Sequence, residues 1–249
     1  MPTYRDQAVV LRTHKLGEAD RIITLLSREH GKLRAVARGV RRTSSKFGGR
    51  LEPFSQVDIQ FAEGRSLDIV AQCESIRPLG EALIDDYEAF TAGQVMLETA
   101  DRLVSEYREP ALQQYWLLVG ALRTLGDGTP DGPRTSAMIL DSYLVRALAI
   151  AGWAPSLTDC ARCGAVGPHQ YFNPSVGGMV CVSCRPPGSA RPDPATIAYL
   201  QALLTGDWAA TREVPPIRQR EASGLVAAFV QWHLDHGLRS MPLVERSWA

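Results

Sequence analysis

The stretch Cys160–Cys184, CARCGAVGPHQYFNPSVGGMVCVSC, carries the strongest structural signal in this 249-residue chain. Its two C-x2-C pairs are separated by seventeen residues, a spacing typical of four-thiolate zinc sites. A gap of two residues lets both sulfurs of a tight knuckle point inward, and two knuckles complete a tetrahedral shell with Zn–S bonds of about 2.3 Å. The sequence therefore predicts one zinc ion per chain, held by Cys160, Cys163, Cys181 and Cys184.

Glycines flank both cysteine pairs and favour the positive φ angles that knuckle backbones need. Gly164 and Gly167 follow the first pair, and Gly177 and Gly178 precede the second. Because four thiolates leave no coordination position for water, we expect the zinc to be structural rather than catalytic.

Two other uses of four cysteines remain as alternatives. Disulfides are disfavoured because Met1–Val10 lacks the apolar core of a secretion signal, which indicates a reducing, cytoplasmic compartment. A redox C-x2-C motif needs only one pair, usually beside a βαβ unit, and no such unit is evident. The most apolar stretch, Ala137–Trp153, is interrupted by Asp141 and Arg146, so we interpret it as a buried helix rather than a membrane span.

A net charge of zero conceals a strong asymmetry along the chain. Residues 1–50 carry twelve Lys and Arg against four Asp and Glu, a net charge of +8. Residues 51–109 carry four against thirteen, a net charge of −9. Positive charge gathered on one module suggests a polyanion as its partner.

The first eighty residues predict a small β-barrel. Five short runs with β-branched or alternating apolar residues are separated by turn-forming residues, and closing such a sheet removes its exposed edges. The predicted strands are Gln7–Thr13, Arg21–Leu26, Lys32–Arg38, Gln56–Phe61 and Leu67–Glu74. Cys73 shares a predicted strand face with Leu67, Ile69 and Ala71, and we interpret it as a small core residue.

From Asp86 onward the apolar period becomes helical. Apolar steps of three and four run from Phe90 to Tyr107 and from Leu112 to Leu122, and the acidic run at residues 85–88 suits a helix N-terminus. Three further helices are expected near Ser136–Ile150, Pro194–Leu204 and Glu221–His236. The predicted class is therefore α+β, with a nucleic-acid-binding barrel at residues 1–80 and a helical domain at 81–249 that contains a zinc-finger insert at 156–190.

Strand alternation turns the N-terminal charge into a predicted surface. Lys32, Arg34 and Arg38 project from one face of their strand, and the strand leads into a basic loop that we expect to be mobile. Arginine on a rigid sheet suits phosphate groups, which it contacts with two hydrogen bonds. Arg12, Lys15 and Arg21 belong to the two preceding predicted strands, where they can lie alongside this face. The full set of predicted DNA contacts is Arg12, Lys15, Arg21, Lys32, Arg34, Arg38, Arg41, Arg42 and Lys46.

Aromatic residues are scarce in this basic module, where only Tyr4 and Phe47 occur among residues 1–50. Single-strand binders usually interleave aromatic and basic residues, so we expect salt-sensitive contacts to the nucleic-acid backbone with little reading of sequence. We find no phosphate-binding loop, no nucleotide-binding glycine motif, no nucleophile motif and no helical metal-hydrolase motif. The pair His233 and His236 lacks a third ligand at helical spacing and is interpreted as helix surface.

Five segments in order along the chain resemble the bacterial DNA repair and recombination protein RecO family. They are Gly17–Leu26 (GEADRIITLL), Gly31–Arg42 (GKLRAVARGVRR), Leu51–Phe54 (LEPF), and Gly152–Pro155 (GWAP) running into Cys160–Gly164 (CARCG). The resemblance covers the whole chain and implies an OB-fold, a helical domain and a zinc-binding insert.

The resemblance also implies an activity without bond cleavage. Members of this family bind single- and double-stranded DNA, anneal complementary strands, and help to load the RecA recombinase onto gaps coated with single-strand-binding protein. The implied partners are RecR and the acidic C-terminal tail of single-strand-binding protein, and the implied location is the cytoplasm, at the nucleoid. For the tail we expect an Arg-rimmed apolar groove among the helices that carry Trp116, Trp208 and Trp232, with most of these tryptophans in the core.

Two other function classes remain as alternatives. An enzyme acting on nucleic acid would use the barrel and zinc modules to hold its substrate, but it needs a carboxylate cluster or a nucleophile set, and the sequence shows neither. A zinc-ribbon transcription adaptor would show a sequence preference in a binding-site selection. The first hypothesis therefore remains a non-enzymatic DNA-binding mediator.

Overall fold

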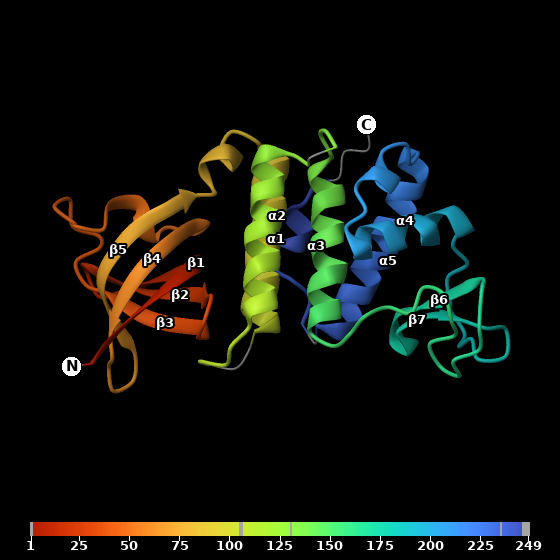
Figure 1. Ribbon diagram of the computed structural model, residues 1–249, viewed down its shortest axis with the longest axis horizontal. Coiled ribbons are helices and arrows are strands. Elements are labelled where there is room, and N and C mark those ends of the chain that lie inside the picture. Colours follow the sequence, from red (N-terminus) through yellow and green to blue (C-terminus); the bar gives the residue numbers. More distant parts are fainter. Residues whose placement is uncertain (1, 105–106, 130, 235, 246–249) are drawn as a thin grey trace. The chain divides into compact units, whose positions relative to one another are not determined.

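The computed structural model describes residues 2–104, 107–129, 131–234 and 236–245 (Figure 1). The chain divides into two compact units, Met1–Asp127 and Gly128–Ala249. The first unit combines a five-stranded barrel with two long helices, and the second combines three long helices with a two-stranded sheet. Two helices that the sequence assigns to residues 81–249 thus pack with the barrel, and the domain boundary at residue 80 stays a prediction.

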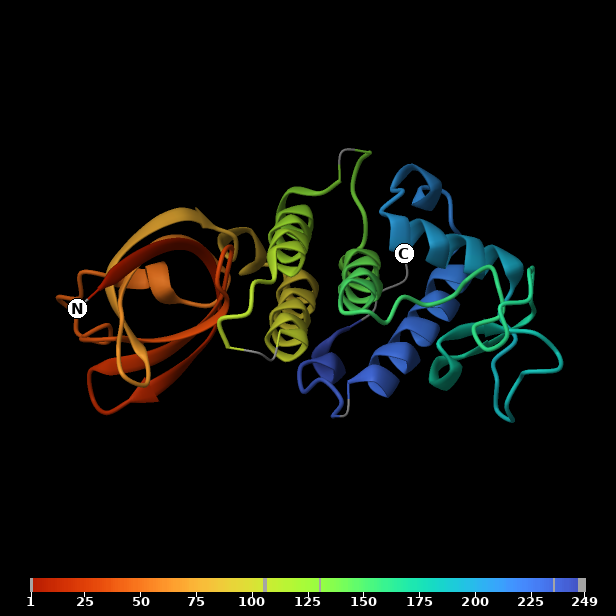
Figure 2. The same cartoon turned by 60° about the horizontal axis from the view of Figure 1, so that its bottom comes forward.

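The five predicted strands form a closed barrel, as can be followed in Figure 2. The strand β1 pairs antiparallel with both β2 and β4, β2 pairs with β3, and the parallel pair of β3 and β5 closes the ring in the order β1-β2-β3-β5-β4. This confirms the expected OB-fold barrel. The bounds are Thr3–Leu16 for β1, Asp20–Ser27 for β2, Gly31–Ala37 for β3, Ser55–Ala62 for β4 and Asp68–Pro78 for β5.

The barrel core follows the predicted alternation on β3 and β4 but departs from it at a bulge on β5. Cys73 is buried in the core, as predicted, but Ile69 and Ala71 on the same strand are only half-buried. The pairing of β4 with β5 shifts between Gln60 and Phe61, which leaves one extra residue on β5. Because a bulge reverses which side chains point inward, Val70 enters the core in place of its predicted neighbours.

Helices α1 (Tyr87–Leu103) and α2 (Leu112–Asp127) complete the first unit. Asp86 caps α1 by accepting a hydrogen bond from the Ala89 backbone N–H at 2.9 Å, in agreement with the predicted role of the acidic run. The Phe54 side chain packs against Gly80, before α1, and against Gly93 on α1. A Cβ atom at Gly93 would lie 2.8 Å from the Phe54 ring. Only glycine therefore fits this contact between the helix and the barrel.

The chain between α1 and α2 crosses the start of β3. The helix α1 ends at Leu103, earlier than the predicted Tyr107, and the Arg108 backbone N–H instead donates to the Lys32 carbonyl at 3.1 Å. Gly31 has φ +64°, and a Cβ atom there would lie 1.8 Å from the Glu109 carbonyl oxygen. The close approach of this connection and the positive φ both require glycine at position 31.

The second unit packs the helices α3 (Ser136–Ile150), α4 (Pro194–Thr205) and α5 (Pro216–His233) against one another. The helix α3 is buried on most of its sides, as its composition predicts. The helix α5 begins at Pro216, not at the predicted Glu221, because proline in the first turn of a helix sacrifices no hydrogen bond. Within the described ranges, no helix is both long and apolar enough to cross a membrane.

Candidate metal centre and nucleic-acid surface

The four cysteines lie in two tight turns that face each other across a small sheet, β6 (Tyr171–Asn173) and β7 (Gly178–Val180). In the first turn the Gly164 backbone N–H donates to the Cys160 carbonyl at 2.8 Å, and in the second the Cys184 N–H donates to the Cys181 carbonyl at 3.1 Å. Phe172 of β6 packs its ring 6.2 Å from the ring of Phe229 on α5. The knuckles are thereby anchored to the helices of the second unit.

The predicted glycine roles hold at three of four positions. Gly164, Gly177 and Gly178 have φ angles of +71°, +96° and +139°. Gly167 lacks a positive φ angle, but a larger residue does not fit at this position, because a Cβ atom there would lie 2.0 Å from the Thr158 carbonyl oxygen. All four glycines therefore shape the knuckles, but for two different reasons.

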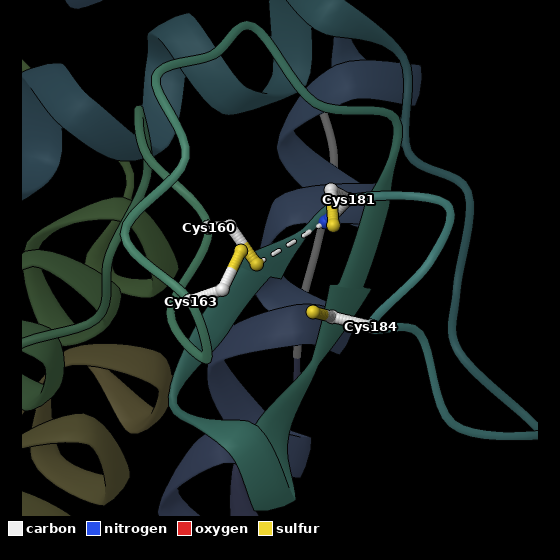
Figure 3. Close-up of side chains that lie close together, drawn as sticks. All are labelled: Cys160, Cys163, Cys181 and Cys184. Carbon is white, nitrogen blue, oxygen red and sulfur yellow. Dashed lines mark hydrogen bonds between the residues drawn. The ribbon is translucent and has the colours of Figure 1, made fainter.

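The sulfur geometry fits a tetrahedral metal ion. All four Sγ atoms lie within 4.8 Å of one another, and Figure 3 shows them converging from the two knuckles. Zn–S bonds of about 2.3 Å in a tetrahedron place the sulfurs about 3.8 Å apart, inside that range. Within the described residues, this is the group of three or more His, Cys, Asp or Glu side chains that could hold a metal ion.

The electrostatics of the cluster also fit a cation. The Cys181 backbone N–H points at the Cys160 sulfur at 3.4 Å and lowers the pKa of that thiol, with the backbone N–H groups of Cys163 and Arg162 acting in the same direction. Hydrogen bonds to Cys181 and Cys163 raise the pKa of Cys184. Four thiolates this close repel one another, and a bound divalent cation would offset that repulsion.

The outer face of β3 shows the predicted alternation. Leu33, Ala35 and Ala37 are buried in the barrel core, while Arg34 and Arg38 are exposed. Neither arginine forms an ion pair within the described part of the chain. Both guanidinium groups are therefore available to a ligand.

Two other predicted contacts are already engaged within the unit. Lys32 pairs with Asp101 of α1 at 2.7 Å, and Arg12 pairs with the other oxygen of the same carboxylate at 2.7 Å. The Lys32 ammonium also donates to the Asp101 carbonyl at 2.6 Å. Arg12 does lie beside Arg34, since both pair across Thr24 of β2, but α1 covers this part of the barrel face. The sequence prediction missed Asp101 as the residue that binds both cations.

Lys15 and Arg21 point to the opposite face of the sheet. They pair with each other across β1 and β2, and Arg21 pairs in turn with Ala37, whose side chain is in the core. Residues opposite each other in register share a face, so these two cations lie at the barrel mouth and not alongside Arg34. Arg21 forms an ion pair with Glu52, whereas Lys15 is exposed and unpaired within the described residues.

The basic loop after β3 is anchored rather than loose. Val40, Phe47 and Leu51 are buried in the barrel core and hold the loop across its end. Arg41 donates to the Glu18 carbonyl at 2.8 Å and Lys46 to the Ala71 carbonyl at 2.8 Å. Their side chains remain exposed, as does that of Arg42, which forms no ion pair in the described part of the molecule. The loop therefore packs across the end of the barrel and presents a basic rim, and its mobility stays a prediction.

Among the described residues, the strongly exposed aromatic side chains of the first unit come from outside residues 1–50. Phe47 is buried, in agreement with the expected lack of stacking surface in the basic module. Tyr107 and Trp116 are each 45% exposed, and the Arg28 guanidinium lies 5.5 Å from the Trp116 ring centroid. Trp232 on α5 is 60% exposed. Trp208 is only half-buried, so none of the three tryptophans is a buried core residue and the expectation that most of them are was wrong.

A hydrogen-bond network that the sequence did not predict joins Asp68, at the start of β5, to Tyr4 and Arg108. Asp68 is buried and accepts hydrogen bonds from the Tyr4 hydroxyl at 2.6 Å and from the Arg108 guanidinium at 2.7 Å. Burial favours the protonated acid, but these two bonds outweigh it and hold the pKa of Asp68 below its ordinary value. Arg108 is therefore a structural residue of the barrel.

Comparisons with known proteins agree on one family. Residues 1–79 match the family model described as Recombination protein O N terminal, and residues 84–242 match Recombination protein O C terminal. The chain is 66% identical to the DNA repair protein RecO of Cutibacterium acnes, with 99% of this chain and all of that protein covered. It is 58% identical to the protein of that name from Nocardioides sp., over 98% of this chain and 99% of the relative. It is 53% identical to the one from Thermobifida fusca, over 99% and 100%. The chain therefore belongs to the recombination protein O family.

Proposed function

We propose that this chain is a non-enzymatic DNA-binding mediator of DNA repair that anneals complementary strands. Its relatives are named DNA repair proteins. The observation that carries the proposal is a set of exposed cations that form no ion pair within the described residues, namely Arg34, Arg38 and Arg42 on β3 and in the segment after it, with Lys15 at the barrel mouth. Fixed guanidinium and ammonium groups with no internal partner suit a phosphate backbone.

The barrel gives these cations a rigid support. Arg34 extends from β3, whose alternate residues are buried in the core, and Arg38 directly follows the end of that strand. Arg42 lies on a loop anchored by buried apolar side chains. Two strands brought to this surface have part of their phosphate charge neutralised, which lowers their mutual repulsion and permits pairing. Because the contacts are to phosphate, single- and double-stranded DNA are both accepted and sequence is read weakly. On this proposal residues 1–80 are the DNA-binding module.

We further propose that the helical region at 81–249 connects this activity to other proteins. A groove of about 590 Å³ in the second unit is lined by Leu157, Pro168 and Ile197 and by two charged residues, Arg191 and Asp159. None of Trp116, Trp208 and Trp232 lines it, so it differs from the groove expected from the sequence. An apolar groove beside an arginine suits an acidic tail with apolar anchors, such as the tail of single-strand-binding protein. Docking on that tail, together with RecR, would place the protein at coated gaps in the nucleoid, where it would help to load RecA.

The metal in this proposal is zinc, bound by the insert at residues 156–190. Four thiolates with tetrahedral spacing favour zinc, and such a closed site leaves no position for a reacting water. The zinc would hold the two knuckles together against α5. It would contribute to folding of the insert and not to bond cleavage.

The deciding experiment is an annealing assay on complementary strands precoated with single-strand-binding protein. We expect this chain to accelerate duplex formation, and Arg34→Glu to reduce that acceleration. Incubation of labelled DNA with Mg²⁺ in parallel should yield paired strands without fragments. Product fragments would instead support the enzyme alternative, and failure to pair coated strands would contradict the mediator role.

A further inference from the structure

A groove in the first unit has walls of a different character from the DNA surface. It measures about 380 Å³ and lies where the barrel meets the start of α1. Its walls are Pro53, Phe54, Pro78, Ile84 and Phe90. These five are apolar, and Ser55, Gln94, Glu52 and Glu81 also line the groove, so it combines a hydrophobic contact surface with a few polar groups.

Two large apolar side chains beside this groove face solvent. Ile84 is 68% exposed and Tyr87 is 56% exposed. The exposure has a local cause, since the neighbouring Leu83 fills the core and turns the next side chain outward. Exposed apolar side chains that border an apolar groove form a patch that a partner can cover.

The charge around the groove has one sign. Its charged lining residues are Glu81 and Glu52, of which Glu52 is paired with Arg21, and residues 79–98 contain five acidic side chains and no Lys or Arg. Glu81 and Asp85 are exposed and form no ion pair within the described residues. The neighbouring Arg77 is paired with Asp127 at 2.7 Å, and the Arg50 guanidinium donates to the Lys46 carbonyl at 3.0 Å. The field at the groove is therefore negative.

We propose that this groove docks a basic segment of a protein partner, anchored by one large aliphatic or aromatic side chain. The anchor would pack between Ile84 and Phe90, and flanking Lys or Arg side chains would face Glu81 and Asp85. Nucleic acid does not fit, because its phosphates would meet unpaired carboxylates. The proposal is independent of DNA binding, which lies on the exposed cations of β3 and the basic loop.

The test uses the full chain and three labelled synthetic peptides that differ in one feature each. The first carries one leucine flanked by lysine and arginine, the second replaces that leucine with serine, and the third replaces the basic residues with glutamate. Fluorescence anisotropy should show binding of the first peptide, at least about tenfold weaker binding of the second, and no binding of the third. Added salt should weaken the first complex because its charges are exposed.

Matched variants localise the peptide. Ile84→Ser removes the apolar contact, and Glu81→Lys with Asp85→Lys reverses the rim; each should weaken binding of the first peptide at least about tenfold. Ile217→Ser and Glu213→Lys change comparably exposed side chains of the second unit and should have no effect. Arg34→Glu should leave peptide binding unchanged, so loss of DNA binding and loss of peptide binding are separate results.

Three outcomes would overturn the proposal. The first is failure of the basic, leucine-containing peptide to bind at about millimolar concentration, or equal binding of the acidic peptide. The second is unchanged binding after Ile84→Ser. The third is sedimentation evidence that this face joins two copies of the chain, with the association lost in Ile84→Ser, which would make a second copy the occupant.

Discussion

Reversing Arg34 and Arg38 together is the sharpest test of the proposed DNA surface. Both side chains are exposed and unpaired within the described residues, so Arg34→Glu with Arg38→Glu should leave the barrel folded. If each guanidinium meets one phosphate, the pair of substitutions lowers the salt slope of log K by about 1.4–1.8. If the two affinities are equal at 1 M salt, this difference in slope makes the variant bind DNA roughly 14- to 30-fold more weakly at about 0.15 M salt. Repulsion from the new carboxylates would add to that loss.

The assay is anisotropy with labelled DNA over a series of salt concentrations, with strand annealing and thermal unfolding measured on the same protein. Lys32→Glu provides a contrast, because Lys32 pairs with Asp101 at 2.7 Å and only 16% of its side chain is exposed. Its loss should lower the free energy of unfolding by about 1–3 kcal/mol and affect DNA binding less than the double reversal. Arg102→Glu is the control, since Arg102 pairs with Glu98 on α1.

Equal losses of DNA affinity from Arg102→Glu and from the double reversal would refute the reasoning. So would an affinity that does not change with salt, because phosphate contacts release counterions. Arg108 is unsuitable as a control, since its guanidinium binds the buried Asp68. Equal losses from the control and the double reversal, or an affinity independent of salt, would mean that the DNA-binding module lies elsewhere in the chain.

Three other perturbations test the remaining structure. Cys181→Ser should abolish binding of the metal ion and loosen the insert while the barrel stays folded, and elemental analysis of purified protein should show about one zinc per chain before the change and none after it. Gly31→Ala should destabilise the first unit by at least about 1–3 kcal/mol from backbone strain alone, as measured by denaturant unfolding. Because the folded pKa of Asp68 is lowered, its contribution is present above the unfolded pKa and is lost as pH falls through the folded value. Asp68→Asn should therefore flatten the acid limb of the stability curve, and an unchanged limb would contradict the assigned network.

Local patterns were sufficient for the elements of the fold. Strand periodicity located all five barrel strands, because alternation along a half-buried strand is a property of adjacent residues. Helical periodicity located the five long helices, with errors at their ends. At α1 the helical spacing of apolar residues continues to Tyr107, but the helix ends at Leu103 and Tyr107 forms a β-bridge with Lys32 of β3. A tertiary contact thus overrode the local signal.

Face assignments that depend on pairing were less predictable. Lys15 and Arg21 were expected beside Arg34, but the register of β1, β2 and β3 places them on the opposite face. The bulge on β5 likewise exchanges Val70 for Ile69 in the core. Register and bulges are set by contacts between strands, so no single strand's sequence contains them.

The sequence by itself determined the candidate ligand set, because Cys160, Cys163, Cys181 and Cys184 belong to two short turns whose spacing already suits a tetrahedral ion. It also determined that positive charge gathers in the first fifty residues. Only the tertiary structure decided which of those charges stay available. Asp101 lies far along the chain from Arg12 and Lys32, yet it binds both, while Arg34 and Arg38 meet no acid in the described structure. Ion pairing depends on distance in space, and that distance exists only after the helices have packed on the barrel.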